Sequence, residues 1–170
     1  MDERSKAQLG RPFGARDFRH ALSQFCSGIV IVTGGSRQQP YGFTAQSFMS
    51  VSLEPPLIAV CPSRESASWP LIRAGRVFTI NVLAEDQREL SRRFASASED
   101  RFAEVDWSAG ESGTPVLAGV LGHIDCELWA EHDAGDHFLA LGHVLGLSVR
   151  NQGRGPLLYF RSDYGGFAQS

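Results

Sequence analysis

The sequence contains none of the short motifs that build the common nucleotide, metal and nucleophile sites. It has no G-x-G-x-x-G turn, no G-x-x-x-x-G-K-[ST] loop, no H-E-x-x-H helix and no G-x-S-x-G elbow. Its three cysteines, Cys26, Cys61 and Cys126, are odd in number and lack the spacing of metal ligands. We therefore expect no metal site, and any nucleotide must bind without a Rossmann or P-loop glycine turn.

Basic residues are also too few for a nucleic-acid surface. The chain carries 16 Lys and Arg against 19 Asp and Glu, a net charge of −3, whereas nucleic-acid-binding domains are usually strongly basic. No secretory h-region opens the chain, and no apolar run approaches membrane-spanning length. We expect no membrane partner and a reducing cytoplasmic location, with the cysteines acting as small buried hydrophobic residues.

Length and composition indicate one globular domain. A chain of 170 residues with 42% hydrophobic and 21% charged residues can bury a sizeable core. Residues 1–16 are polar and show no sustained period, so we expect a flexible N-terminal arm. Residues 17–170 contain no linker, internal repeat or low-complexity segment and are expected to form the single domain.

Hydrophobic spacing predicts the elements of the first half. Phe18, Leu22 and Phe25 fall on one face of a helix that starts at Asp17 and stops at Gly28. A buried strand over 29–33 and the segment from Tyr41 onward predict a hairpin. Further along we expect a strand over 57–61, a short helix with Pro70 in its first turn and Gly75 at its end, a strand over 77–83, and a helix over 84–97.

The second half is β-rich. Residues 98–115 show little period and predict a loop, whereas 123–131 and 139–149 alternate as a hairpin and 157–160 adds a last strand. Six or seven short strands with two or three helices predict a closed antiparallel barrel and disfavour a doubly wound sheet.

One segment, Tyr41 to Pro56, has an unusual pattern for a core element. Apolar residues alternate with hydroxyl and amide residues, and a Pro-Pro pair ends the segment. Its hydroxyls and its amide, carried by Thr44, Gln46, Ser47, Ser50 and Ser52, can present neutral donors and acceptors to one planar, heteroatom-rich ligand. Composition alone favours the simpler interpretation of a polar-faced strand that leads into a turn.

Residues Ser63 to Ser68 form the best candidate anion site. The segment follows a strand and opens a short helix, where hydroxyls, N–H groups and the helix dipole favour a phosphate. Serines at a helix start are also ordinary caps, and sequence alone favours capping.

Thr44-Ala45-Gln46-Ser47-Phe48-x-Ser50-Val51-Ser52-Leu53-x-Pro55-Pro56-Leu57 resembles the signature of the flavin reductase family. The stretches Trp69–Arg73, Asn81–Gln87 and Gly135-Asp136-His137 are similar too, so the resemblance runs from about Phe18 to Phe167. One departure is Gln46, where many relatives have Asn, so the longer side chain alters the contact expected there.

The resemblance implies a fold, an activity and partners. The fold is the FMN-binding split β-barrel, antiparallel and Greek-key-like, and usually a homodimer with flavin near the subunit interface. The activity is transfer of a hydride from NADH or NADPH to FMN or FAD, which supplies reduced flavin to a separate flavin-dependent monooxygenase. The alternative is a non-catalytic flavin- or tetrapyrrole-binding module on the same barrel, because fold does not fix function.

The resemblance also implies a set of site residues. His137 is the candidate catalytic residue, associated with the nicotinamide; a turn histidine hydrogen-bonded to Asp136 or to backbone is the alternative. Asn81 either contacts flavin or caps the helix at Ala84, and the cap is favoured. The cofactor-binding candidates are Thr44, Ala45, Gln46, Ser47, Ser50, Val51, Ser52, Cys61, Ser63, Arg64, Ser66, Asn81, Phe102 and Tyr164.

The remaining aromatic, basic and histidine side chains receive structural assignments. Phe94, Phe102, Trp107 and Trp129 are expected to pack, although one of them or Tyr164 could cover the flavin, and Arg101 could serve a phosphate. His143 is expected in the core, and His20, His123 and His132 at the surface.

Overall fold

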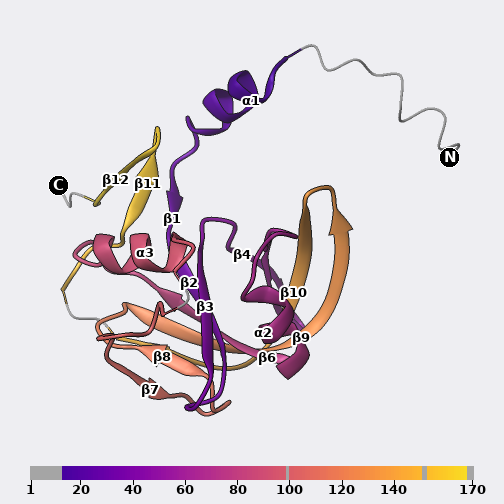
Figure 1. Cartoon of the computed structure of the whole chain (residues 1–170), viewed down its shortest axis with the longest axis vertical. Coiled ribbons are helices and arrows are strands. Elements are labelled where there is room, and N and C mark those ends of the chain that lie inside the picture. The colour runs from indigo at the N-terminus through magenta and orange to yellow at the C-terminus, as the bar shows by residue number, and fades with distance from the viewer. Residues whose placement is uncertain (1–12, 99, 151–152, 168–170) are drawn as a thin grey trace, which may run out of the picture.

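The structure, a computed structural model, describes residues 13–98, 100–150 and 153–167 (Figure 1). The elements in chain order are α1 (Ala15–Leu22), β1 (Ser27–Gly28), β2 (Val30–Gly35), β3 (Pro40–Ala45), β4 (Met49–Leu53), β5 (Pro56–Val60), α2 (Trp69–Gly75), β6 (Val77–Val82), α3 (Arg88–Ala95), β7 (Trp107–Ala109), β8 (Pro115–Leu117), β9 (Gly122–Ala134), β10 (His137–Val149), β11 (Leu158–Phe160) and β12 (Asp163–Gly165). In these ranges no helix reaches the length and hydropathy of a membrane span. Residues 1–12 of the expected arm lie outside the described residues.

Seven strands form one antiparallel sheet in the order β3-β2-β6-β9-β10-β5-β4. Laid flat, its two edge strands would lie about 29 Å apart. Yet β3 ends at Ala45 and β4 begins at Met49, a step that spans at most about 14 Å. The sheet must therefore curl until its edges approach each other, which is the barrel expected from the sequence.

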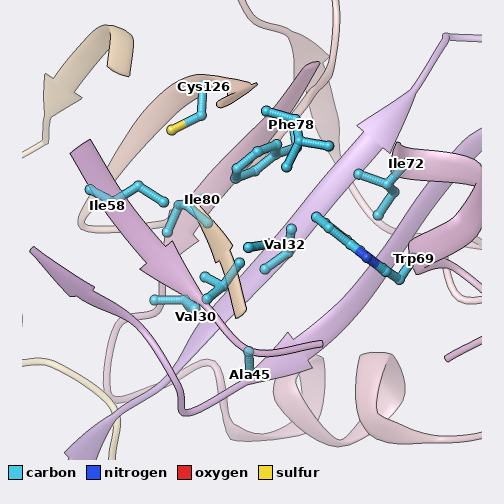
Figure 2. Close-up of a cluster of buried hydrophobic side chains, with 12 residues drawn as sticks. Val30, Val32, Ala45, Ile58, Trp69, Ile72, Phe78, Ile80 and Cys126 are labelled. Atoms are coloured by element: carbon cyan, nitrogen blue, oxygen red, sulfur yellow. The ribbon is translucent and has the colours of Figure 1, made fainter. Parts of the chain in front are cut away.

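Strand β2, the second strand from one edge of the sheet, is buried on both faces. Val30 and Val32 pack into one hydrophobic cluster with Trp69 and Phe78, which Figure 2 shows inside the curled sheet. Ile31, with Ile29 just before the strand, packs into a second cluster that includes Phe94 on α3. Because both faces are covered, the strand is continuously apolar instead of alternating.

The expected hairpin over the second half is confirmed as β9 and β10, which pair from His137↔Ala134 to Val149↔Gly122. Gly135, at a φ of +72°, provides the left-handed residue that the tight turn requires. Register shifts at Leu141/Gly142 and Val144/Gly146 bend the pair, since bulges increase local twist. Figure 1 shows the resulting curve of the β9–β10 hairpin. His137, the first residue of β10, forms a β-bridge with Ser63 in the segment that follows β5.

The two longer expected helices are shorter than predicted. α1 ends at Leu22, buries none of its residues, and leaves Phe18 at 50% exposure. α3 begins at Arg88 because the preceding residues are tied to the C-terminal segment: Ala84 bridges Pro156, and the Glu85 N–H donates to the Gly155 carbonyl at 2.9 Å. Tertiary hydrogen bonds here override helix propensity.

Other expectations fail in the outer layers. The loop predicted over 98–115 contains β7 and the start of β8, a small two-stranded sheet. Trp129, expected to pack, is 57% exposed on β9. His123 and His143 are both half-buried, whereas His20 and His132 are exposed.

The cysteines differ from one another in burial. Cys126 is buried as expected, and burial, with a further contribution from the charge of Asp125, raises the pKa of its thiol to about 12. Cys61 is half-buried and Cys26 is exposed, so the expectation of buried cysteines is wrong for Cys26.

Candidate active site

A cleft of about 740 Å³ lies where the end of β3, the segment after β5, the end of α3 and the β11–β12 hairpin meet. This volume is typical of small-molecule sites. The residues that line the cleft are Ile29, Phe43, Thr44, Ala45, Gln46, Ser47, Cys61, Ser63, Glu65, Ser66, Ala67, Phe94, Ala95, Ser96, Ala97, Arg101, His137, Tyr159 and Tyr164.

The end of β3 contributes a neutral polar rim. The Thr44 hydroxyl donates to the Ser91 carbonyl of α3 at 2.7 Å, which fixes the strand end against the helix. The Ser47 hydroxyl accepts the Cys61 N–H at 2.9 Å and so ties the rim to the segment after β5. The exposed Gln46 uses its Oε1 to accept from Ser27 at 3.3 Å, which leaves its amide N–H groups to face a ligand.

The segment after β5 forms the opposite rim. The Ser63 hydroxyl accepts the Glu65 N–H, and the Ser66 hydroxyl accepts the Trp69 N–H at the start of α2, each at 3.2 Å. Ser66 therefore performs the capping that the sequence left open between capping and phosphate binding. Each hydroxyl keeps its proton available as a donor toward the cleft.

Arg101 cross-links three segments of the cleft wall. Its guanidinium donates to the Gly42 carbonyl of β3 at 3.0 Å and to the Ser68 hydroxyl before α2 at 2.7 Å. It also donates twice to the Ser96 carbonyl after α3, at 3.0 and 2.6 Å. Arg101, which the sequence offered as a possible phosphate ligand, is thus committed to hydrogen bonds within the cleft wall.

The fit of α3 against β3 requires a glycine at position 42. A Cβ on Gly42 would lie 2.7 Å from Cε1 of the buried Phe94, well inside van der Waals contact. The missing side chain lets α3 approach the sheet and brings its C-terminal end to the cleft.

His137 begins β10 at the edge of the cleft, where it bridges to Ser63. Its Nδ1 lies 2.8 Å from an Asp136 carboxylate oxygen, and its side chain is 44% exposed. The carboxylate accepts the Nδ1 proton, so Nε2 of the neutral ring is an acceptor. The hydrogen bond to Asp136 is the one that the turn-histidine alternative predicted, and it coexists with a position in the cleft wall.

Two tyrosines on the C-terminal hairpin supply an aromatic wall. Tyr159 and Tyr164 face each other across β11 and β12, with ring centroids 5.1 Å apart and nearly perpendicular planes. The Tyr164 hydroxyl lies 3.1 Å from the Ser91 hydroxyl, and the Arg88 guanidinium lies over its ring at 5.1 Å. This wall offers polarisable surface to a planar ring system.

Nine of the predicted site residues meet in the cleft: Thr44, Ala45, Gln46, Ser47, Cys61, Ser63, Ser66, His137 and Tyr164. Six others do not. Ser50, Val51 and Ser52 lie on the edge strand β4, outside the lining of this chain's cleft. Phe102 instead packs against Phe94 and Trp107, at centroid distances of 5.0 and 5.9 Å.

Arg64 is directed away from the cleft by three contacts. It pairs with Asp133 of β9, donates to the Gly135 carbonyl at 2.8 Å, and lies 4.4 Å above the Phe138 ring. The β9–β10 turn thus holds the Arg64 guanidinium outside the cleft, although Ser63 and Glu65 on either side of it in sequence line the cleft.

Asn81 is part of the interior and neither lines the cleft nor caps α3. It is fully buried, donates to the Ile31 carbonyl and the Thr33 hydroxyl at 3.2 and 2.9 Å, and accepts the Leu117 N–H at 2.8 Å. The Ala84 N–H is capped instead by Gln87 Oε1 at 3.0 Å.

Replacing Asn81 with alanine should destabilise the fold without weakening ligand binding in the cleft. The change leaves the buried Leu117 N–H and Ile31 carbonyl with fewer partners, at a cost of about 1–3 kcal/mol. Urea unfolding monitored by circular dichroism measures this loss. A normal unfolding midpoint together with a large loss of ligand affinity would instead show that Asn81 contributes to ligand binding.

Glu65, Tyr159 and the turn at Ser96–Ala97 line the cleft although sequence reasoning did not select them. Tyr159 could have been selected from the sequence, because it lies in the strand predicted over 157–160. The sequence did not predict the partner strand β12, in which Tyr164 pairs with Tyr159. Glu65 and Ser96–Ala97 carry no motif, and their place follows from where α3 and the β5–α2 segment end.

Comparison with known proteins agrees with this geometry. Residues 22–168 match the family model described as the flavin reductase like domain. The reductase subunit HsaB of a flavin-dependent monooxygenase from Rhodococcus jostii is 46% identical over 151 residues, which cover 89% of this chain and 77% of that protein.

Solved structures agree in fold as well. Nitrilotriacetate monooxygenase component B from Mycobacterium thermoresistibile superposes with a TM-score of 0.87 at 44% identity, covering 90% of this chain and 86% of that one. The NADH:FAD oxidoreductase SgcE6 from Streptomyces globisporus, in complex with NAD and FAD fragments, has a TM-score of 0.87 at 34% identity, covering 95% and 98%. The chain, a curled antiparallel barrel with a polar and aromatic cleft, belongs to the flavin reductase family.

Proposed function

We propose that this chain is an NAD(P)H-dependent flavin reductase that binds FMN or FAD in the cleft described above. It passes a hydride from a nicotinamide nucleotide to the flavin and supplies reduced flavin to a separate monooxygenase component. The observation that carries the proposal is the cleft itself, in which a neutral rim over Thr44–Ser47 faces the aromatic pair Tyr159 and Tyr164.

The donor set of the cleft suits a flavin. A tricyclic ring with carbonyl and imine edges needs neutral hydrogen-bonding groups at its rim and apolar surface at its faces. The Gln46 amide and the backbone around Ser47 supply the first, and Tyr159 and Tyr164 supply the second. The hydroxyls of Ser63 and Ser66 supply donors for the phosphorylated end.

A flavin held in the cleft would supply the two-electron acceptor for the hydride of the nicotinamide, so that the nicotinamide would be oxidised as the flavin is reduced. The protein's part is to orient the reactants and to stabilise the developing charge. His137 would hold the nicotinamide end through Nε2, with its tautomer set by the hydrogen bond between Nδ1 and Asp136. Backbone N–H groups near Ser47 would stabilise negative charge that develops on a bound flavin ring.

The test mixes purified protein, FMN or FAD, and NADH or NADPH under anaerobic conditions. We expect the visible absorbance of oxidised flavin to bleach at a rate proportional to protein concentration. Tight flavin retention without bleaching would identify the non-catalytic flavin-binding module instead. Absence of bleaching with every combination of flavin and nucleotide would reject the proposed activity.

The reductase is further proposed to act as a homodimer. Apolar side chains are exposed on the edge strand β4, where Met49 is 58%, Val51 48% and Leu53 91% exposed. An uncovered apolar edge strand invites pairing with another chain, and a second copy would cover it. This also gives a role to the Ser50–Ser52 stretch outside this chain's cleft, at a subunit interface near the flavin.

Light scattering coupled to size exclusion should give twice the chain mass of 18.6 kDa. Leu53→Glu should shift the mass toward the monomer, because a carboxylate would have to be buried at the interface. Leu71→Glu, which changes an exposed leucine of α2, is the control and should leave the mass unchanged. A monomeric wild-type protein would contradict the proposal.

A cytoplasmic location is part of the same proposal. Cys26, Cys61 and Cys126 are free thiols, as expected where glutathione and thioredoxin keep cysteines reduced. Nicotinamide nucleotides and a soluble oxygenase component are accessible there.

A further inference from the structure

We infer that Arg101 is a positioning residue: it gives the cleft a positive wall where the end of α3 alone would give a negative one. The inference rests on the proposed flavin reductase function and adds the source of the charge that favours a phosphorylated flavin. Arg101 lines the cleft and is half-buried. It acts through the wall, because its guanidinium donates to protein groups on three segments.

The C-terminal end of α3 forms part of the cleft wall, where Ala95, Ser96 and Ala97 line the cleft. A helix C-terminus carries about half a negative charge, which repels an anionic ligand. Arg101 covers this end, since Nε and a terminal nitrogen of its guanidinium both donate to the Ser96 carbonyl, at 3.0 and 2.6 Å. One full positive charge against about half a negative one leaves this part of the wall positive.

No carboxylate neutralises Arg101 within residues 13–98, 100–150 and 153–167. Its hydrogen-bond acceptors are the Ser96 and Gly42 carbonyls and the Ser68 hydroxyl, and it enters none of the ion pairs found in these ranges. Glu65 also lines the cleft but is exposed, so water and salt screen its charge more than that of the half-buried Arg101. The positive charge of Arg101 therefore remains available to a ligand in the cleft.

Arg101 is also joined to the segment proposed to hold the phosphorylated end of the flavin. Its guanidinium donates to the Ser68 hydroxyl at 2.7 Å, and Ser68 directly precedes α2. Ser66, a proposed phosphate donor, lies just before Ser68 in the same segment and lines the cleft. The hydrogen bonds to Ser68 and Ser96 thus fix the cation beside the phosphate-binding segment, and its charge acts on the phosphate without a direct hydrogen bond.

Comparing FMN with riboflavin tests the charge, because riboflavin has the same ring and ribityl chain but no phosphate. Titration followed by flavin fluorescence gives Kd for both ligands in wild type, Arg101→Gln and Arg101→Lys. Arg101→Gln removes the charge and should lower the ratio of the riboflavin Kd to the FMN Kd about five- to tenfold. Arg101→Lys keeps the charge but loses the planar fork, so it should weaken binding of both flavins and keep the ratio within about twofold.

Arg76→Gln is the matched control. Arg76 is the C-cap residue of α2, donates to the Leu128 carbonyl at 2.9 Å and lies outside the cleft lining. Loss of its charge should leave the ratio of the two Kd values unchanged. A purely structural role for Arg101 predicts that Arg101→Gln weakens binding of both flavins equally, so an unchanged ratio in Arg101→Gln would overturn the inference.

Salt gives a measurement that needs the wild-type protein alone. Raising the ionic strength from about 0.01 M to about 0.15 M should lower the ratio, because screening weakens the attraction between the phosphate and the positive wall. A ratio that does not change with salt in wild type would overturn the inference even if the Arg101 variants failed to fold. Failure of the reductase proposal appears differently, as absence of flavin bleaching with either nucleotide.

Discussion

His137→Ala is expected to lower kcat/KM for the nicotinamide nucleotide by about 10- to 100-fold, a loss typical of a misplaced reactant. The flavin Kd should change little, because the flavin rim is built from Thr44–Ser47 on another element. Stability should also change little, since the side chain is 44% exposed and its partner Asp136 is 96% exposed. Steady-state kinetics, flavin titration and a melting curve measure the three effects separately.

Conservative substitutions identify the atom involved. Gln places its amide near the position of Nε2, whereas Asn places its amide near Nδ1, so recovery by His137→Gln alone assigns the function to Nε2. His132→Ala changes an exposed histidine of the same hairpin and should leave turnover unchanged. A lowered melting temperature with normal turnover in His137→Ala would assign His137 a purely structural role.

The parts of the fold that the sequence predicts well are those where one face or both faces are buried. The run Ile29–Val32 predicts a buried strand, and the structure covers β2 on both sides. The alternation over β9 and β10 predicts a hairpin because local pairing and burial agree there.

The failures occur where distant contacts decide the local structure. Ala84 and Glu85 have helix-forming sequence, but contacts with the segment around Gly155 hold Ala84 in a β-bridge and Glu85 in a turn. Strands β7 and β8 have three residues each, too few for a hydrophobic period to appear. The apolar face of α1 predicts burial, yet among the described residues α1 has no buried side chain.

The same reason limits prediction of the site. Thr44–Ser52 is one continuous motif, but Ala45 ends β3 and Met49 begins β4, strands that occupy opposite edges of the sheet. The first half of the motif therefore lines the cleft while Ser50–Ser52 lies outside it. Hydrophobic periodicity does not predict that the motif divides between the cleft and strand β4, because this division depends on the tertiary arrangement of the sheet.

Trp69→Ala is expected to cost about 3–5 kcal/mol of unfolding free energy, the largest stability effect among these variants. Trp69 is 1% exposed, and its ring packs edge-on against Phe43 and Phe78 at 6.2 and 6.1 Å. Its Nε1–H also donates to Glu131 at 2.7 Å. Truncation leaves a cavity in the cluster shown in Figure 2 and leaves the Glu131 carboxylate with one partner fewer.

The substitution should also disturb the cleft, because the Trp69 side chain anchors α2 in the core. The start of α2 is in turn linked to the cleft-lining Ser66, whose hydroxyl accepts the backbone N–H of residue 69. Flavin affinity is therefore expected to fall in Trp69→Ala even under conditions where the protein remains folded. Trp129→Ala is the matched control: its side chain is 57% exposed on β9, and the change should stay within about 0.5 kcal/mol. Chemical denaturation of the two variants side by side would contradict the packing described here if both lost stability equally.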